Sequence, residues 1–235
     1  MSYLIKLNTL GKGGYGEVVK IKDIRNNKYY ALKISKVSEY GTSVLEYNVL
    51  FTLEHPNIIK GINFTSRLNP LTSYIQMELA DMTLDDYISL NQKIDNDNLI
   101  YELLSAINFL HENNFVHCDI KPDNILIKNN RLKLADLGLV GLKYLLPNAC
   151  LHAVFSPPEF IIYSLKENTR DYDILENFII NKKYKFLSAE SLDIWAVGMI
   201  IYYILQKRFL LPEEIFIFVS RYINYIKDYM DKLNR

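Results

Sequence analysis

The sequence is poor in glycine, cysteine and tryptophan, with 9, 2 and 1 of these residues among 235. Two cysteines are too few for a disulfide framework, which indicates a reducing compartment. The formal net charge is zero, from 27 basic and 27 acidic residues, whereas proteins that bind nucleic acid usually carry a basic excess. These shortages argue against a disulfide-rich secreted protein and against a nucleic-acid partner.

Long apolar segments are also missing. The first residues, MSYLIK, lack the charged start, the apolar run and the cleavage site of a signal peptide. The longest apolar run covers residues 194–205, which is too short to span a bilayer and predicts a buried helix. We therefore expect a cytoplasmic protein without a membrane partner. The hydrophobic fraction of 49% is ordinary for a packed globular chain.

Periodicity divides the chain into a strand-rich part and a helix-rich part. Alternating segments bounded by turn residues predict strands at residues 3–10, 17–24, 29–35, 58–64 and 73–79. Helical spacing of apolar residues predicts helices at residues 42–54, 84–90 and 97–113. The pattern changes near residues 79–83, so we predict an N-terminal lobe at 1–79 and a C-terminal lobe at 80–235. The fold class expected is α+β.

Four of the nine glycines fall within six residues, at Gly11, Gly13, Gly14 and Gly16. A G-x-G-x-x-G motif suits a dinucleotide-binding fold or a hairpin that covers nucleotide phosphates. Here a second strand follows, starting near Val18, where a dinucleotide site would need a helix. The context favours a hairpin over phosphates, with an ordinary glycine-rich turn as the alternative.

A lysine, Lys33, lies on the apolar strand that follows this hairpin. Burying an ammonium is costly unless it meets anions, and a phosphate together with a carboxylate would serve. The next predicted helix offers Glu46 as that carboxylate, with Glu39 and Glu54 as alternatives at the helix margins. A surface lysine without such a role is the competing interpretation.

The most specific cluster follows the long predicted helix, at residues 117–126, and reads HCDIKPDNIL. It precedes a short hairpin and then Asp136, which stands two residues before Gly138. Oxygen ligands from Asn124 and Asp136 would suit Mg²⁺, which prefers few protein ligands plus substrate phosphates. Asp119 would then be left to accept a hydroxyl proton.

Taken together, these motifs resemble those of eukaryotic-type protein kinases of the serine/threonine type, over residues 4–211. The glycine loop, strand lysine, helix glutamate, catalytic-loop Asp with downstream Asn, and Asp before Gly occur in the family's order. Leu137 stands where the family has Phe, and Pro157-Pro158-Glu159 replaces Ala-Pro-Glu. The resemblance implies a bilobal fold with an N-terminal antiparallel sheet plus one helix and a mainly helical C-terminal lobe, and ATP and Mg²⁺ as cofactors.

The resemblance also implies a role for each matching residue. The glycine loop would cover the ATP phosphates, and the catalytic roles fall to Lys33, Glu46, Asp119 and Lys121. Metal binding falls to Asn124 and Asp136. The adenine pocket and the hinge would be formed by Leu10, Val18, Ala31, Met77, Glu78, Ala80 and Leu126. For the apolar members of this set, core packing explains the residue type nearly as well.

The implied function is ATP-dependent phosphoryl transfer to Ser/Thr hydroxyls of a protein substrate, because serine/threonine members carry Lys at the position of Lys121. Cys118 replaces the Arg that receives an activation-loop phosphate in the family. We therefore predict an enzyme that is not controlled by activation-loop phosphorylation, and that is constitutively active or controlled by a regulatory protein partner. The alternative is a pseudokinase, a nucleotide-binding or partner-docking regulator, which His152 in place of a substrate-loop Thr would favour.

Three further features depart from the family pattern. Residues 164–187 are an apparent insertion, interpreted as a surface loop or, second, as a partner site. The chain continues for only one or two predicted helices after Pro212, so a truncated C-terminal lobe is expected. A zinc site formed by His117, Cys118, Cys150 and His152 is rejected, because the spacing differs from that of zinc ligands.

Overall fold

The computed structural model describes residues 3–13, 16–35, 40–68, 71–90, 95–143, 155–157 and 189–209. Two compact units contain them, Met1–Lys143 and Tyr144–Arg235. The lobe boundary predicted at residues 79/80 falls within the first unit and stays a prediction. Several residues singled out from the sequence lie outside the described ranges, namely Gly14, Glu39, Cys150, His152, Glu159 and the segment 164–187.

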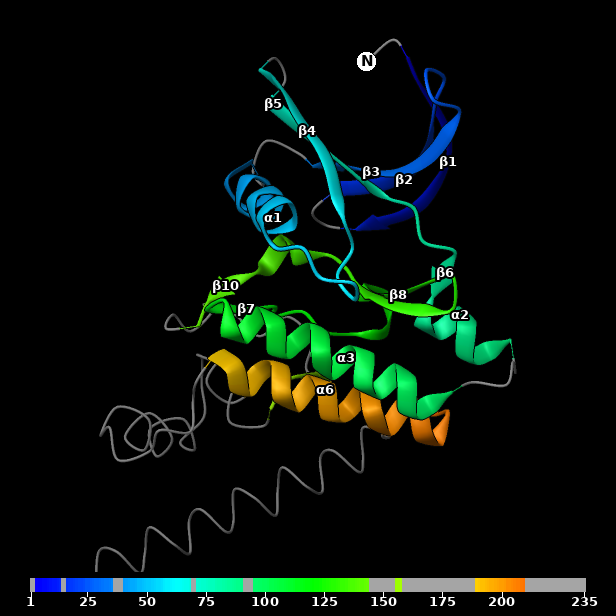
Figure 1. Cartoon of the computed structure of the whole chain (residues 1–235). Coiled ribbons are helices and arrows are strands. Elements are labelled where there is room, and N and C mark those ends of the chain that lie inside the picture. Colours follow the sequence, from blue (N-terminus) through cyan, green and yellow to red (C-terminus); the bar gives the residue numbers. More distant parts are fainter. Residues whose placement is uncertain are drawn as a thin grey trace, which may run out of the picture. The chain divides into compact units, whose positions relative to one another are not determined.

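The first unit begins with a five-stranded sheet, which Figure 1 shows in blue to cyan. Its strands are β1 (Leu4–Gly13), β2 (Gly16–Asp23), β3 (Lys28–Ser35), β4 (Gly61–Leu68) and β5 (Leu71–Glu78), in the order β1-β2-β3-β5-β4. All neighbouring pairs are antiparallel. Val19 and Ile21, two residues apart on β2, form a small core with Leu32 of β3, as the period of two in a strand requires. The predicted N-terminal antiparallel sheet is observed.

One helix, α1 (Tyr40–Thr52), packs against β4 and β5 of this sheet. The chain after it was expected to start a strand at residue 58, but β4 begins at Gly61. The backbone at residues 57–59 is engaged elsewhere, because Ile59 N donates to Leu134 O (2.8 Å) and Leu134 N donates to Asn57 O (2.8 Å). Figure 1 shows the chain descending from α1 before it returns to β4.

Short strands follow where the sequence predicted mainly helices. One three-stranded sheet pairs β6 (Met82–Thr83) with β8 (Ile125–Lys128), and β8 with β9 (Arg131–Leu134). A second, smaller sheet pairs β7 (Phe115–Val116) with β10 (Gly141–Leu142). Two 3₁₀ turns, η2 (Pro122–Asn124) and η3 (Leu137–Leu139), stand next to these strands. The polar cluster of residues 117–136 lies in the sequence between β7 and β10, the two strands of the smaller sheet.

The other two helices predicted for this unit are also present, as α2 (Leu84–Ser89) and α3 (Asn96–Glu112). The hydroxyl of Thr83 accepts from Asp86 N, and the Asp86 carboxylate accepts from Thr83 N, which is a capping box. The first turn of α3 is capped by Asp95, whose carboxylate accepts from Asn98 N at 3.0 Å. Each helix therefore starts at a side chain that satisfies a backbone N–H left without an intrahelical partner.

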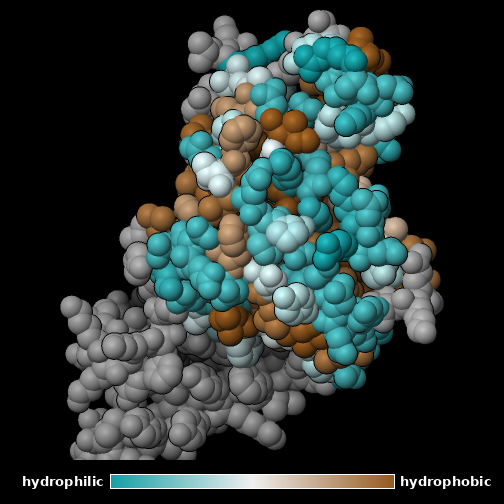
Figure 2. All heavy atoms as spheres, in the orientation of Figure 1, coloured by the Kyte–Doolittle hydropathy of each residue, from teal (hydrophilic) through white to brown (hydrophobic). Residues whose placement is uncertain are grey.

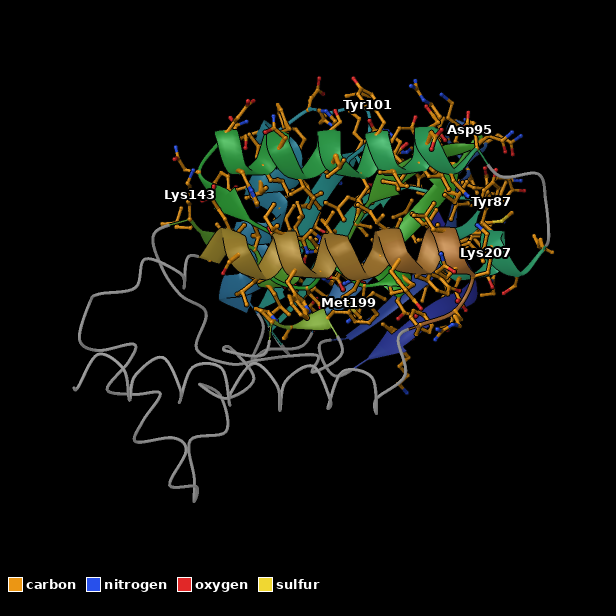
Figure 3. The ribbon with its side chains drawn as sticks, turned by 90° about the horizontal axis from the view of Figure 1, so that it is seen from below. Tyr87, Asp95, Tyr101, Lys143, Met199 and Lys207 are labelled. Atoms are coloured by element: carbon orange, nitrogen blue, oxygen red, sulfur yellow. The ribbon has the colours of Figure 1, made fainter. Side chains whose placement is uncertain are left out.

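The apolar stripe of α3 is mostly buried, as predicted, with Leu99, Leu103, Ile107 and Leu110 at 0–3% exposure. Leu104, another apolar residue of this helix, is 44% exposed. Tyr101 projects away from the unit (Figure 3) and is 71% exposed. The buried stripe of α3 is thus narrower than the apolar sequence of the helix indicates.

The second unit contains α6 (Ala189–Gln206), which includes the apolar run that predicted a helix. Beyond its end, the ring of Phe209 stacks on Tyr203 with 4.1 Å between ring centroids, and Phe155 meets Phe209 edge-on at 6.1 Å. Asp193 is buried on this helix. Within the described ranges, no helix has both the length and the apolarity needed to cross a bilayer.

Candidate active site

The buried lysine of β3 lies between two carboxylates. Lys33 Nζ lies 2.9 Å and 2.8 Å from the two oxygens of Glu46 and 2.6 Å from Asp136 Oδ1. Only 10% of the Lys33 side chain and 1% of the Glu46 side chain are exposed. Glu54, the alternative partner, instead pairs with Lys60 at the surface, 2.6 Å away. The predicted pairing of Lys33 with Glu46 is therefore observed.

Burial and charge act against each other in this group of three residues. Burial lowers the pKa of Lys33, but the charges of Glu46 and Asp136 outweigh it and raise that pKa above its ordinary value. Burial raises the pKa of Glu46, and the Asp136 carboxylate adds to this against the attraction of Lys33. Burial also acts to raise the pKa of Asp136, yet the Lys33 ammonium outweighs it and the pKa is lowered. Lys33 is therefore cationic and Asp136 anionic at neutral pH.

The backbone around Asp136 bends sharply to present its carboxylate. Asp136 has φ 60° and ψ 69°, a left-handed conformation that short polar residues tolerate, and its Oδ1 accepts from Gly138 N at 3.4 Å. A Cβ on Gly138 would lie 3.0 Å from Lys33 Nζ, so glycine at this position leaves room for the ammonium. The Asp136 side chain is 42% exposed and accessible to a ligand.

A buried histidine organises the loop that precedes Asp119. His117 is 0% exposed, and its Nε2 lies 3.0 Å from Ala135 O while its Nδ1 accepts from Asp119 N at 3.2 Å. These partners require a proton on Nε2, so the imidazole is in the Nε2–H tautomer. Cys118, between His117 and Asp119 in the sequence, has a positive φ of 65°. The loop is thus anchored to the segment that leads into Asp136.

The carboxylate of Asp119 accepts hydrogen bonds from two neighbouring side chains. Its Oδ2 accepts from Lys121 Nζ and from Asn124 Nδ2, each at 2.8 Å. Asn124 Nδ2 also donates to Asp119 O at 2.7 Å, so the amide oxygen of Asn124 is left as its acceptor group. Ala135 N donates to Asn124 O at 2.8 Å, one residue before Asp136. Hydrogen bonds from Asp119 through Asn124 to Ala135, and the peptide bond from Ala135 to Asp136, therefore connect this group to the Asp136–Lys33 pair.

The glycine loop is the turn between β1 and β2. Gly11 lies opposite Val18, and Gly13 lies opposite Gly16. Gly16 has φ +152°, and a Cβ there would overlap Ile34 O, so this position requires glycine. Gly11 and Gly13 have open space where a Cβ would be. Sterics within the described chain therefore explain Gly16 but give no reason for the other two.

The residues assigned to the adenine pocket come from neighbouring strands. Val18 lies directly opposite Lys33, and Ala31 directly opposite Met77. Residues directly opposite in an antiparallel pair share a face, as do residues two apart on one strand, so Val18, Ala31 and Met77 are on the face that carries Lys33. Leu10 on β1 is 49% exposed.

The remaining pocket residues lie at the end of β5 and on β8. Glu78 N donates to Lys60 O at 3.0 Å, so a nucleotide base could use only the carbonyl of Glu78. Ala80 follows two residues later and is partly buried. Leu126 lies on β8 opposite Thr83 and is also partly buried. The ligand contacts expected of these three residues stay predictions.

Sequence reasoning missed two side chains that hold β9 in place. Glu102, on α3 with a side chain 2% exposed, accepts from Leu132 N at 2.7 Å and from Arg131 Nε at 2.9 Å. Asn57 Nδ2 donates to Leu132 O at 3.0 Å. The signal for Glu102 was present, because a carboxylate within the apolar stripe of a helix needs a partner when buried. Both residues fix the strand that leads to Asp136.

Comparison with known proteins gives a family match over most of the chain. The model of the protein kinase domain matches residues 4–220. A "probable serine/threonine-protein kinase" of Dictyostelium discoideum is 31% identical over 201 residues, which is 83% of this chain and 36% of that protein. The "probable serine/threonine-protein kinase MRK1 homolog" of Encephalitozoon cuniculi is 31% identical over 204 residues, 82% of this chain and 56% of that protein.

A third relative is covered more fully. A "probable cell division protein kinase" of Encephalitozoon cuniculi is 31% identical over 210 residues, which is 87% of this chain and 72% of that protein. The chain thus spans 36% and 56% of the length of the first two relatives. Together with the observed N-terminal sheet, the match over residues 4–220 confirms the predicted α+β, kinase-like fold class.

Proposed function

Because this chain belongs to the protein kinase family, we propose that it transfers the γ-phosphoryl group of ATP to Ser/Thr hydroxyls of protein substrates. The observation that carries the proposal is the connected set of Lys33, Asp136, Asn124 and Asp119. Lys33 Nζ lies 2.6 Å from Asp136, and Asn124 Nδ2 lies 2.8 Å from Asp119 Oδ2. Phosphoryl transfer needs positioning and charge neutralisation more than covalent chemistry from the protein, and this set supplies groups for both.

Protein kinase domains in general use ATP with a divalent metal ion, and we assign Mg²⁺ to Asn124 and Asp136. The donor set fits, because one carboxylate and one amide oxygen are hard ligands of the kind Mg²⁺ takes beside substrate phosphates. Both N–H groups of Asn124 are directed to Asp119, which leaves its oxygen to the metal. The ion, when bound, neutralises phosphate charge.

The chain's own residues then divide the work between them. The Lys33 ammonium, held by Glu46, binds phosphate oxygens, and the backbone of Gly11, Gly13 and Gly16 covers the phosphates; Gly14, assigned to the same loop, lies outside the described residues. Asp119 orients the acceptor hydroxyl and accepts its proton, and the hydrogen bonds from Lys121 and Asn124 fix that carboxylate. Lys121 also reaches the γ-phosphate, which favours Ser/Thr over Tyr as the acceptor.

Regulation follows from Cys118. The family's Arg at this position receives an activation-loop phosphate by charge-assisted hydrogen bonds, and a thiol has no charge with which to do so. The Cys118 side chain instead lies 3.8 Å from Val116 O. We infer that activity is either constitutive or set by a protein partner. The pseudokinase alternative is not favoured, because the residues needed for transfer are connected as an active set would be.

The test is replacement of Asp119 by Asn, assayed as phosphate transfer from radiolabelled ATP to a generic basic protein. Loss of the base should lower kcat by roughly 10²–10⁴. The matched control is Asp97→Asn, an exposed carboxylate in the first turn of α3, which should leave turnover unchanged. Transfer by Asp119→Asn at the rate of the parent protein would refute the role of Asp119.

A pair of otherwise identical peptides that carry Ser or Tyr at one position tests the acceptor class. Label on the Ser peptide and none on the Tyr peptide is expected. Preference for Tyr would contradict the assignment of Lys121, and nucleotide binding without transfer to any acceptor would favour the pseudokinase.

A further inference from the structure

A pocket of about 390 Å³ lies in the first unit, apart from the residues proposed to carry out transfer. Its apolar lining comes from the end of α1, with Leu50 and Leu53, and from the following segment, with Pro56, Ile58 and Ile59. The volume is within the range of small-molecule sites, which are mostly apolar with a few polar groups. On the face drawn in Figure 2, which has the orientation of Figure 1, hydrophobic residues lie between hydrophilic ones.

On the polar side of the pocket, two carboxylates and two lysines are paired, and the pair that matters here is Glu78 with Lys133. Glu78 accepts from Lys128 Nζ at 2.6 Å, Lys133 Nζ at 2.8 Å and Lys60 N at 2.9 Å, so its carboxylate is largely occupied. Lys133 lines the pocket, is only 16% exposed, and within the described part of the chain pairs with Glu78 alone. An ammonium has three N–H groups, so Lys133 retains donors for a ligand.

A second residue of the pocket wall, His55, lies close to Lys133. His55 lines the pocket, stacks on Phe109 with 4.8 Å between ring centroids, and accepts from Asn57 N at 3.1 Å. Burial lowers the pKa of His55, and the charge of Lys133 lowers it further. His55 is therefore neutral at pH 7, mainly because of burial, with Lys133 close enough to oppose a positive charge on it. Lys60 and Glu54, which also line the pocket, form an exposed ion pair.

The pocket is also largely preformed. Its wall at residues 55–60 is hydrogen-bonded to two strands. Ile59 N donates to Leu134 O of β9 at 2.8 Å, and Glu78 N of β5 donates to Lys60 O at 3.0 Å. The side chain of Leu50 beneath it is 2% exposed. A wall that is fixed on two sides reduces the ordering cost of binding.

We propose that this pocket binds a small organic carboxylate, with the carboxylate at Lys133 and an apolar body of aromatic or branched aliphatic type against Leu50, Leu53 and Ile58. A carboxylate uses the donors of a partly buried ammonium that its own partner, Glu78, leaves unused. The apolar body covers the hydrophobic lining. This second site shares Glu78 with the predicted hinge but includes none of Lys33, Asp119, Asn124 and Asp136, and its occupancy does not depend on phosphoryl transfer.

The test uses 3-phenylpropanoate as the probe and 3-phenylpropanamide as its neutral control, with binding to the full chain measured by titration calorimetry. The acid should bind saturably, and the amide about tenfold more weakly, since a charge-assisted hydrogen bond is lost. Lys133→Met should weaken binding of the acid about tenfold, and Leu53→Trp should abolish it by filling the pocket. Lys28→Met, an exposed lysine on β3, is the control and should bind as the parent protein does.

Several results would overturn the proposal. The first is no saturable binding of the acid at millimolar concentration. The second is equal affinity for the acid and the amide, and the third is unchanged binding in both Lys133→Met and Leu53→Trp. Thermal melts of each variant establish that it is folded. The comparison of acid with amide on the parent protein needs no variant, so it decides the matter even where a substitution prevents folding.

Discussion

Replacing Lys33 by Met removes the only cation from a group that contains two carboxylates. Methionine has nearly the volume and shape of the lysine stem, so packing is kept. Glu46, whose side chain is 1% exposed, is then a buried carboxylate without its partner and with Asp136 nearby. Breaking a buried pair in this way costs about 3–5 kcal/mol of the free energy of unfolding when the remaining group stays charged.

Protonation of Glu46 limits that cost. A carboxyl of ordinary pKa 4.5 can be neutralised at pH 7 for about 1.4 kcal/mol per pH unit, or about 3.4 kcal/mol in total. We therefore expect Lys33→Met to lower the free energy of unfolding by about 3 kcal/mol at pH 7. Glu46→Gln should cost less, about 1.5–3 kcal/mol, because Lys33 keeps Asp136 as its partner at 2.6 Å.

The sign of the pH dependence follows from the direction of the shift. The pKa of Glu46 is raised on folding, and removing Lys33 raises it further. A carboxyl with a raised pKa holds its extra proton in the folded state, so its contribution to stability is present below 4.5 and is lost as the pH rises. The defect of Lys33→Met should therefore shrink by about 2 kcal/mol between pH 7 and pH 5.5.

Urea unfolding followed by circular dichroism at both pH values measures this effect, with Lys33→Met/Glu46→Gln as the decisive variant. The double variant has no carboxyl at residue 46 to protonate. It should therefore be more stable than Lys33→Met at pH 7, and the advantage should fall as the pH is lowered. A defect of Lys33→Met that is independent of pH, or a double variant that is less stable than Lys33→Met at pH 7, would refute the electrostatic account.

Two other side chains lead to stability predictions. Glu102→Gln should lower the free energy of unfolding by about 1–3 kcal/mol, because the amide cannot accept from both Leu132 N and Arg131 Nε; urea unfolding measures it, and the exposed Glu112→Gln should show no loss. Gly16→Ala should cost about 1–3 kcal/mol through backbone strain, since the new Cβ would meet Ile34 O. The melting temperature of Gly11→Ala, where a Cβ finds open space, should be unchanged by comparison.

Motif identity and order were readable in the chain itself. The glycine cluster, Lys33, Glu46 and the cluster at residues 117–136 were recognisable by residue type. Burying charged side chains such as these lowers stability unless they bind a counter-charge, a phosphate or a metal ion. Strand alternation located β1, β2 and β3, and helical spacing located α3. These features are local in the sequence, which is why the sequence could predict them.

The contacts between segments distant in sequence were decided only by the tertiary structure. The pairing of Lys33 with Asp136 spans 103 positions, and the choice of Glu46 over Glu54 depended on which carboxylate faces β3. The strand expected at residue 58 starts at Gly61, because the backbone at residues 57–59 is hydrogen-bonded to β9. Periodicity reports which side chains prefer burial, but hydrogen bonding between distant strands is settled only when the chain is folded.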